Sequence, residues 1–421
     1  MNQVDSERII GGLVERGFEI VPEEEADIIV VNTCGFIESA REESIDTILS
    51  VADLKKKGKL KALIVAGCLA ERYKNELKKD LTEADAIVGL ADVGKIPDLC
   101  CELLDYSNQN GNGYSRVIIG SPYTAYLKIA EGCDNRCSYC AIPIIRGRFR
   151  SVAAEDILKE ARELSELDIQ ELVLIGQDTT CFGSDLGGEK NLPWLLEKLN
   201  ELEGIEWIRL LYTHPAHFKE EFIEAFNGLS KVLPYIDMPL QHISGRILES
   251  MNRKTTPEKI KKLLETLRER IDGLVLRTSL IVGFPGETEK DFSELVAFIE
   301  RYRFERLGAF MYSPEEGTLA ARIKDRVPDD LARERYEKLM EIQSGISADF
   351  QRSLIGREFD MIVDEIEPVT GRATGRSYMD APEIDGNVSV ARGVEEGNAF
   401  YRVRITDAGR YDLAGEVVCE Q

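Results

Sequence analysis

The sequence is short of histidine, of long apolar runs and of positive charge. Only His214, His217 and His242 occur among its 421 residues, which argues against a histidine-rich zinc site. Apolar runs such as "ADIIVVNTC" are far shorter than the roughly 20 residues that cross a bilayer. No basic-then-apolar leader opens the chain, so we expect no secretion, no membrane partner and, by default, a cytoplasmic location.

Acidic residues outnumber basic ones by a wide margin. The chain has 53 Lys and Arg against 76 Asp and Glu, which gives a formal net charge of −23. Such a chain is repelled by nucleic-acid phosphates unless it has a local basic patch, and it attracts a basic partner. Its length predicts two to four domains, and 43% hydrophobic with 31% charged residues is an ordinary globular composition.

Residues 1–105 have the pattern of a parallel α/β domain. The apolar strand patterns "ADIIVVNTC", "ALIVAGC" and "DAIVGL" alternate with amphipathic helix patterns at 6–17, 36–58 and 69–79. Strands that are apolar throughout are covered on both faces, which predicts a parallel sheet between helices. The polar stretch "DYSNQNGNGYSR" has too little apolar surface to fold, so it predicts a linker over 106–122.

Two further domains follow in the pattern. Residues 123–350 predict six strands with five helical segments between them, and therefore a partial (β/α)6 TIM-like barrel with its chemistry on the carboxyl-end loops. The six strand patterns are 124–130, 171–177, 207–213, 233–240, 275–283 and 306–313. Residues 354–421 alternate apolar and polar positions between turn signals, which predicts a small antiparallel β-barrel with an OB-like shape.

The most informative motif is "EGCDNRCSYC", which places Cys133, Cys137 and Cys140 in the spacing C-x-x-x-C-x-x-C. Nine unevenly spaced cysteines in a large chain do not form a disulfide framework, so a metal or redox role is expected for the clustered ones. Structural zinc takes four ligands, and electron-transfer clusters take four cysteines each. Three thiolates fit three corners of a [4Fe–4S] cube with one iron left for a substrate, and the alternative is a degenerate zinc knuckle.

Cys34 and Cys68 form a second pair. Each ends a predicted strand and precedes a predicted helix in the first domain. Ligands of open parallel sheets gather outside the carboxyl ends of the strands, so we expect the two thiols to face one site. The alternative is two buried thiols that only fill core space.

The three-cysteine motif resembles that of the radical S-adenosylmethionine superfamily. The resemblance implies S-adenosylmethionine on the free iron and its one-electron cleavage to a 5′-deoxyadenosyl radical. Tyr139 stands directly before the third cysteine, where the superfamily usually has an aromatic side chain that shields the adenine. "LIGQD" and "SLIVGFPGET" follow the second and fifth barrel strands and resemble the segments that meet the methionine moiety and the adenine. The further contacts implied are Gly176, Gln177, Asp178, Arg277, Ser279, Ile281 and Gly283.

The arrangement of the whole chain resembles the methylthiotransferase family. In that family the first domain holds a second [4Fe–4S] cluster through three cysteines, of which only Cys34 and Cys68 are visible here, and the tail is a TRAM domain. The implied reaction replaces an unactivated C–H bond by C–S–CH3. One S-adenosylmethionine gives the radical, another gives the methyl group, and sulfur is delivered at the second cluster. An electron donor is an implied partner.

The substrate branch is indicated by four stretches. "NQVDSE", "VNTCGFIESAREESIDTI", "YIDMPLQHIS" and "RSYMDAPEIDG" resemble the branch that modifies the β-carbon of an aspartate in small-subunit ribosomal protein S12. The alternatives are the tRNA adenosine branch and a non-catalytic iron–sulfur protein. Residues 354–421 hold seven basic and fourteen acidic residues, a net −7, which suits a cationic protein loop better than tRNA.

The opening "MNQVDSERII" already predicts a helix start, with no strand before it. In the family, a strand that ends in cysteine precedes the N-x-x-D-S-E segment. We therefore expect a chain that lacks its amino-terminal strand, assembles the radical cluster and holds the second cluster poorly. Of the other cysteines, Cys100 and Cys101 are predicted to be buried packing residues, Cys181 a free thiol and Cys419 structural, and His242 is predicted to line the pocket.

Overall fold

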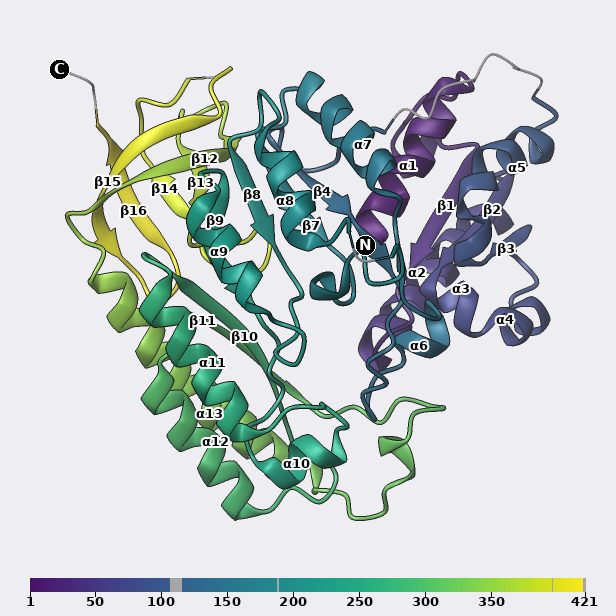
Figure 1. The fold of residues 1–421 in the computed structure, drawn as a ribbon. Helices are drawn as coiled ribbons and strands as arrows, with labels where there is room; N and C mark the ends of the chain where they lie inside the picture. The colour runs from purple at the N-terminus through teal and green to yellow at the C-terminus, as the bar shows by residue number, and fades with distance from the viewer. Residues whose placement is uncertain (107–115, 188, 396, 419–421) are drawn as a thin grey trace.

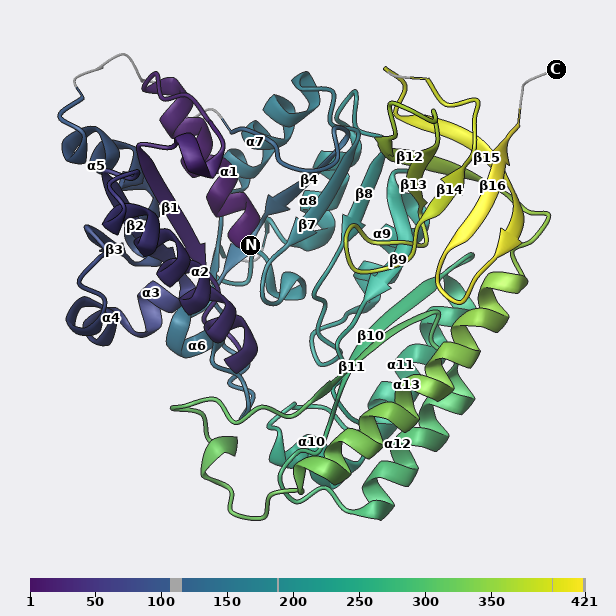
Figure 2. The same ribbon diagram turned by 180° about the vertical axis from the view of Figure 1, so that it is seen from behind.

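The computed structural model describes residues 1–106, 116–187, 189–395 and 397–418. Figures 1 and 2 show an amino-terminal α/β part on one side of a central sheet and a tail barrel toward the other side. Most of the predicted linker and Cys419 lie outside the described residues. The described Val117 and Ile119 are held to the first helix, because both backbone amides donate to Glu7. No helix among the described residues is long and apolar enough to cross a membrane.

The amino-terminal part is a three-stranded parallel sheet in the order β1-β2-β3. Its strands are β1 (Ile28–Thr33), β2 (Ala62–Gly67) and β3 (Ala86–Val88). The helices are α1 (Asn2–Glu15), α2 (Glu38–Lys56), α3 (Cys68–Arg72), α4 (Lys74–Asp80) and α5 (Ile96–Leu103). Alternate residues of β2 face opposite ways: Leu63 and Val65 pack with the α2 side, and Ile64 and Ala66 with the α1 and α5 side. The predicted helix over 69–79 is two helices, separated at Tyr73.

The central sheet has six parallel strands in the order β11-β10-β9-β8-β7-β4. They are β4 (Thr124–Lys128), β7 (Glu171–Ile175), β8 (Trp207–Leu210), β9 (Val232–Asp237), β10 (Val275–Val282) and β11 (Arg306–Met311). The outer helices are α7 (Ala154–Glu166), α8 (Leu192–Asn200), α9 (Glu220–Gly228), α11 (Pro257–Arg270), α12 (Glu289–Tyr302) and α13 (Asp329–Arg352). Shorter elements are β5 (Ala130–Glu131), α6 (Ile142–Ile145), β6 (Arg150–Ser151) and α10 (Gly245–Ser250). Since β4 and β11 are the two edges, the partial barrel is confirmed.

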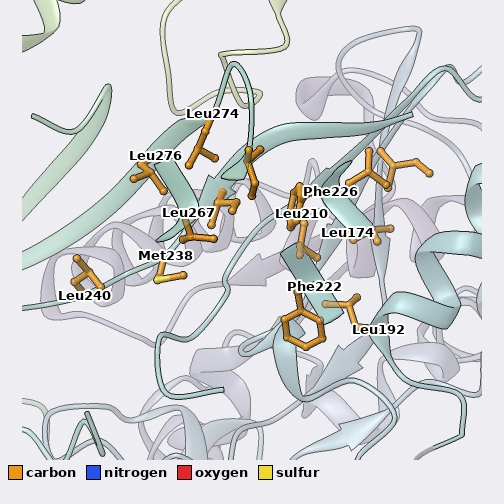
Figure 3. Packing of buried hydrophobic residues seen from close by; sticks show 14 of the residues in the cluster. Leu174, Leu192, Leu210, Phe222, Phe226, Met238, Leu240, Leu267, Leu274 and Leu276 are labelled. Atoms are coloured by element: carbon orange, nitrogen blue, oxygen red, sulfur yellow. The ribbon is translucent and has the colours of Figure 1, made fainter. Parts of the chain in front are cut away.

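Helices cover the outer face of this sheet through an apolar core (Figure 3). Leu174 of β7 and Leu210 of β8 pack there with Leu192 of α8 and with Phe222 and Phe226 of α9. Val173 and Ile175, the alternating neighbours on β7, pack instead in the cluster that includes the tail barrel. The two faces of the strands thus join the helices on one side and the tail on the other.

The tail is a closed five-stranded barrel in the order β12-β13-β14-β16-β15. Its strands are β12 (Glu358–Ile366), β13 (Ala373–Ser377), β14 (Val388–Val390), β15 (Phe400–Ala408) and β16 (Leu413–Val417). The prediction of a small OB-like barrel is confirmed, but β14 and β16 pair in parallel. A closed ring with an odd number of strands cannot alternate direction all the way round, so one parallel pair is unavoidable.

Ion pairs fix the amino-terminal part against the central sheet. Arg72 of α3 lies 2.9 Å from Glu315 in the loop after β11, and Arg41 of α2 pairs with the same carboxylate. Lys128 at the end of β4 lies 2.7 Å from Asp5 of α1. These contacts bring the carboxyl ends of both sheets toward each other.

Candidate active site

The three-cysteine loop begins directly after β5 at Gly132. This residue has φ +74°, and an added Cβ would lie 2.1 Å from the carbonyl oxygen of Arg148, so only glycine fits. The Cys133 amide donates to the carbonyl of Gly147 (3.2 Å), and the Ser138 amide donates to the carbonyl of Met251 (2.9 Å). The loop is therefore held by backbone bonds to two other segments of the domain.

The three thiols of this loop influence one another electrostatically. Burial, together with the neighbouring Cys137, raises the pKa of Cys133 to about 11 and that of Cys140 to about 12. Ionising all three requires positive charge, and Arg253 already places Nη1 3.5 Å from the Cys137 sulfur. The donor set of three soft thiolates fits an iron–sulfur cluster, whose irons supply the remaining charge.

The three sulfurs are not gathered as tightly as the ligands of one zinc ion. A tetrahedral zinc with 2.3 Å bonds holds its sulfurs roughly 3.8 Å apart. Among the described side chains, the ligand atoms of Cys133, Cys137 and Cys140 do not all lie within 4.8 Å of one another. At least one pair of the three sulfurs is therefore farther apart than a single zinc ion requires.

The "LIGQD" segment contains a buried polar atom with no partner. The Oε1 of Gln177 accepts no hydrogen bond within the part of the chain that is described. This orphaned acceptor, beside the cluster loop, fits a polar ligand such as S-adenosylmethionine. Gly176 leaves room next to Ala130, since an added Cβ would lie 3.4 Å from the Ala130 side chain. Tyr139 packs against Ile247 and its apolar neighbours.

Asp178 is bonded within the protein. Its carboxylate accepts from Asn135 Nδ2 (2.7 Å) and from Thr180, and lies 2.8 Å from Nδ1 of His217. Asn135 belongs to the cysteine loop, so Asp178 braces that loop. Its direct contact with S-adenosylmethionine stays a prediction.

The residues expected at the adenine are also engaged within the fold. The Ile281 amide donates to the carbonyl of Gln241, whose own amide donates to the carbonyl of Ser279. Gly283 has φ +72°, and its amide donates to Glu287. The structure thus gives these positions a role in holding the loop after β9, and their role in binding adenine is untested.

Arg277 has partners of its own as well. Its Nη1 donates to Asp237 (2.8 Å), and its Nε lies 3.5 Å from Asp385 of the tail barrel. A ligand carboxylate would have to share this guanidinium with Asp237. The predicted carboxylate contact is therefore also untested.

Cys34 and Cys68 lie together, as the strand pattern predicts. Thr33 pairs with Gly67 at the last register position of β1 and β2, and the two cysteines follow directly. Burial raises the pKa of the Cys68 thiol, Arg146 opposes this, and Cys34 is close enough to raise that pKa again. Arg146 Nη2 lies 3.3 Å from the Cys68 sulfur.

These two thiols are two of the three ligands expected at that site. The other described cysteines lie elsewhere: Cys100 and Cys101 are on α5, and Cys181 follows β7. Besides Arg146, Asn2 is a polar neighbour, with its Oδ1 3.5 Å from the Cys68 sulfur. The pair fits a metal cluster in chemistry and placement, with one ligand unaccounted for among the residues described.

The structure also places Cys100, Cys101 and His242, for which the sequence made predictions. Cys100 is buried in the core, but Cys101 is partly exposed, because successive side chains on a helix point about 100° apart. His242 is fully buried and accepts from the Ser244 amide, so it supports a turn, and its place in the pocket stays a prediction.

Sequence reasoning missed the group formed by Asp178, Cys181 and His217, and the arginines beside Cys137 and Cys68. Cys181 and His217 follow neighbouring strands, β7 and β8, and that order was the available signal.

Comparisons with known proteins agree with this architecture. The family model described as "Radical SAM superfamily" matches residues 127–299. "Uncharacterized protein family UPF0004" matches 1–89, and "TRAM domain" matches 355–418. The solved structure of the radical S-adenosylmethionine methyltransferase TsrM from Kitasatospora setae, with tryptophan and a SAM analog, superposes with a TM-score of 0.53. It is 14% identical, and the match covers 78% of this chain and 80% of that one, so it shows a shared fold.

The partial barrel and its three-cysteine loop define a radical S-adenosylmethionine enzyme, a class that implies a [4Fe–4S] cluster and S-adenosylmethionine. "Ribosomal protein uS12 methylthiotransferase RimO" from Heliobacterium modesticaldum is 45% identical, and the match covers 100% of this chain and 93% of that protein. The protein of the same name from Clostridioides difficile is 45% identical over 100% of this chain and 97% of its own length. The chain belongs to the family of ribosomal protein uS12 methylthiotransferases.

Proposed function

We propose that this chain methylthiolates an aspartate β-carbon of ribosomal protein S12, converting C–H to C–S–CH3. The observation that carries the proposal is the closeness of the two thiol sites. Ala141 directly follows Cys140 of the first site, and Ala141 and Ile145 pack with Cys68 of the second in one apolar cluster. A radical generated at one site and a sulfur held at the other would therefore act within a short distance.

The residues for two cofactor sites are available. Cys133, Cys137 and Cys140 would hold the radical [4Fe–4S] cluster, and Cys34 and Cys68 would contribute to a second one. The proposed contacts of S-adenosylmethionine are Tyr139, Gly176, Gln177, Asp178, Arg277, Ser279, Ile281 and Gly283. When bound, these groups supply one-electron hydrogen abstraction and methyl transfer.

The chain's own contribution is charge and burial at the ligand sulfurs. Arg253 and Arg146 are both buried, and each donates toward one cysteine sulfur, Cys137 or Cys68. A guanidinium stays charged in a low-dielectric site, so it stabilises the ionised thiolates. The buried Ala141 and Ile145 keep the space between the two sites apolar.

Charge supports a protein substrate over tRNA. The net charge of −23, together with the acidic tail, favours a cationic partner, and a ribosomal protein loop has that character. We further propose a cytoplasmic location, a separate electron donor, and a division into an amino-terminal domain (1–105), a radical domain (123–350) and a TRAM domain (354–421).

The test is an anaerobic assay of reconstituted protein with S-adenosylmethionine, a low-potential reductant and either ribosomal protein S12 or tRNA. We expect 5′-deoxyadenosine and an S12 peptide heavier by one methylthio group at aspartate. Cys137→Ala should abolish both products, while Cys101→Ala, a thiol on the distant α5, should keep them. Methylthiolated tRNA would point to the sister reaction. No 5′-deoxyadenosine at all, with iron present, would leave a non-catalytic iron–sulfur protein.

A further inference from the structure

Three side chains of metal-binding types converge where β7 and β8 end, beside the three-cysteine loop but without using any of its sulfurs. The Cys181 sulfur lies 3.0 Å from Nδ1 of His217, and that nitrogen lies 2.8 Å from Oδ2 of Asp178. The sulfur and the carboxylate oxygen are 3.4 Å apart. Among the described residues, no other group of three or more Cys, His, Asp or Glu side chains has all its ligand atoms within 4.8 Å of one another.

Neighbouring groups hold these side chains in position. Asn135 and Thr180 donate to the Asp178 carboxylate. The His217 ring stacks on His214, with centroids 4.8 Å apart and planes 28° apart. Hydrogen bonds from second partners orient metal ligands in proteins, and Asp178 has them here, while the His217 ring is held by stacking.

The distances are close to those that a divalent metal ion needs. Tetrahedral zinc with bonds of about 2.3 Å to sulfur and 2.0–2.1 Å to nitrogen and oxygen sets its ligands roughly 3.3–3.6 Å apart. The observed 2.8–3.4 Å is a hydrogen-bonded arrangement that opens to this size with small side-chain movements. The His217 side chain is 29% exposed and Cys181 is partly exposed, so water can reach a fourth position.

A further polar atom beside the group lacks a partner. His214 is 5% exposed, and its Nε2 has no hydrogen-bond partner in the described structure. Its Nδ1 already accepts from the Ala216 amide, so Nε2 carries the proton and is a donor. A buried donor without an acceptor indicates a missing ligand or water at this place.

We propose that Asp178, Cys181 and His217 bind one zinc or ferrous ion, with water as the fourth ligand; Asp178 would bind it through Oδ2, and this role replaces its proposed contact with S-adenosylmethionine. One thiolate, one imidazole and one carboxylate form a ligand set that suits either ion and leaves an open position. Asn135 connects this site to the cysteine loop, because its side chain bonds Asp178 and its amide donates to the Cys133 sulfur at 3.5 Å. A bound ion would thereby stiffen the loop that holds the radical cluster.

The test uses the cluster-loaded protein, dialysed anaerobically against Zn²⁺, with zinc and iron counted in the same sample. We expect about one tightly bound zinc per chain, with a zinc X-ray absorption spectrum showing one sulfur near 2.3 Å and lighter atoms near 2.0–2.1 Å. Cys181→Ser and His217→Gln should each weaken zinc binding at least ~10-fold without loss of iron. The matched control Cys101→Ser, another partly exposed thiol, should bind zinc as the parent does.

Three results would overturn the site. They are zinc affinity unchanged in both variants, a zinc shell with three sulfurs, which would place the ion on the cluster cysteines, and no zinc retained by the parent protein. Because the readout is metal content and coordination, these results do not depend on methylthiolation. A chain inactive on S12 can still hold this ion, and an active one can lack it.

Discussion

At the scale of single residues, each thiol site has one buried arginine against one sulfur. Arg253 lies 3.5 Å from the Cys137 sulfur, and Arg146 lies 3.3 Å from the Cys68 sulfur. Arg253 also donates to the carbonyl of Pro239, which fixes its guanidinium in place. Hydrogen bonds to ligand sulfurs are one of the means by which proteins set the potential of an iron–sulfur cluster.

Arg253→Met should make the reduction potential of the radical cluster more negative, because reduction adds negative charge that the guanidinium stabilises. We expect a shift of roughly 60 mV, about tenfold in the one-electron equilibrium. An anaerobic redox titration followed by electron paramagnetic resonance measures it. Arg253→Lys keeps the charge and should stay nearer the parent value. An unchanged potential in Arg253→Met, with full iron content, would contradict the proposed role.

At the scale of elements, the turn from β2 into α3 depends on Gly67. This residue has φ +97°, and an added Cβ would lie 2.4 Å from the Asn32 side chain and 2.6 Å from the Thr33 carbonyl oxygen. The close approach of two parallel strand ends leaves no room for a side chain there. Gly67 therefore sets where Cys68 starts its helix beside Cys34.

Gly67→Ala should lower stability and displace Cys68. A positive φ costs a non-glycine residue about 1–3 kcal/mol, and the crowding at Asn32 and Thr33 adds to that cost. Gly58→Ala is the matched control, since Gly58 has φ +72° but no atom near its added Cβ. We expect a larger drop in melting temperature for Gly67→Ala, together with less iron beyond that of the radical cluster. Equal drops and equal iron in the two variants would show that the crowding is relieved at no cost.

At the scale of the whole molecule, a buried ionic group joins the tail barrel to the central sheet. Glu171 of β7 lies 2.7 Å from Arg209 of β8 and 2.8 Å from Arg376 of β13, and all three side chains are buried. Trp207 and Phe400 add an edge contact, with ring centroids 4.8 Å apart. Glu171 and Trp207 begin their strands, so the tail is fixed at the end of the sheet opposite the cysteine loop.

This group makes stability depend on pH in a defined direction. Burial opposes ionisation of Glu171, but Arg376 and Arg209 outweigh it and hold the pKa at about 2, below the ordinary 4.5. A lowered folded-state pKa gives stability that is full above pH 4.5 and is lost as pH falls toward 2. Glu171→Gln leaves the buried Arg209 without its carboxylate and Arg376 with Asp364 alone, so we expect a loss of about 3–5 kcal/mol at neutral pH.

Unfolding followed by near-ultraviolet circular dichroism at several pH values measures this loss. The parent protein should lose more stability than Glu171→Gln between pH 6 and 3, so the two should converge in acid. Glu155→Gln, which removes an exposed partner of Lys190, is the control and should change little. Parallel pH profiles for the parent and Glu171→Gln would disprove the assignment.

Much of this molecule could be predicted from its sequence. The strands β1, β2, β4 and β7 to β11 all fall within or next to the predicted segments, because a run of apolar residues between turn signals is a local property. The nearness of Cys34 and Cys68 followed from the same pattern, since parallel strands end at one edge. The cluster loop was specified by its spacing alone.

Other features depended on the tertiary structure. The sequence by itself determined the order of elements, the cysteine spacing and the acidic charge, which are set by neighbours along the chain. Only the folded molecule decided that Cys181 meets His217, that Arg146 reaches Cys68, that Arg277 pairs with Asp237 and that β14 runs parallel to β16. These contacts join residues far apart in sequence. The order and register of the strands and the closure of the barrel bring those residues together, and no local sequence pattern encodes that order, register or closure.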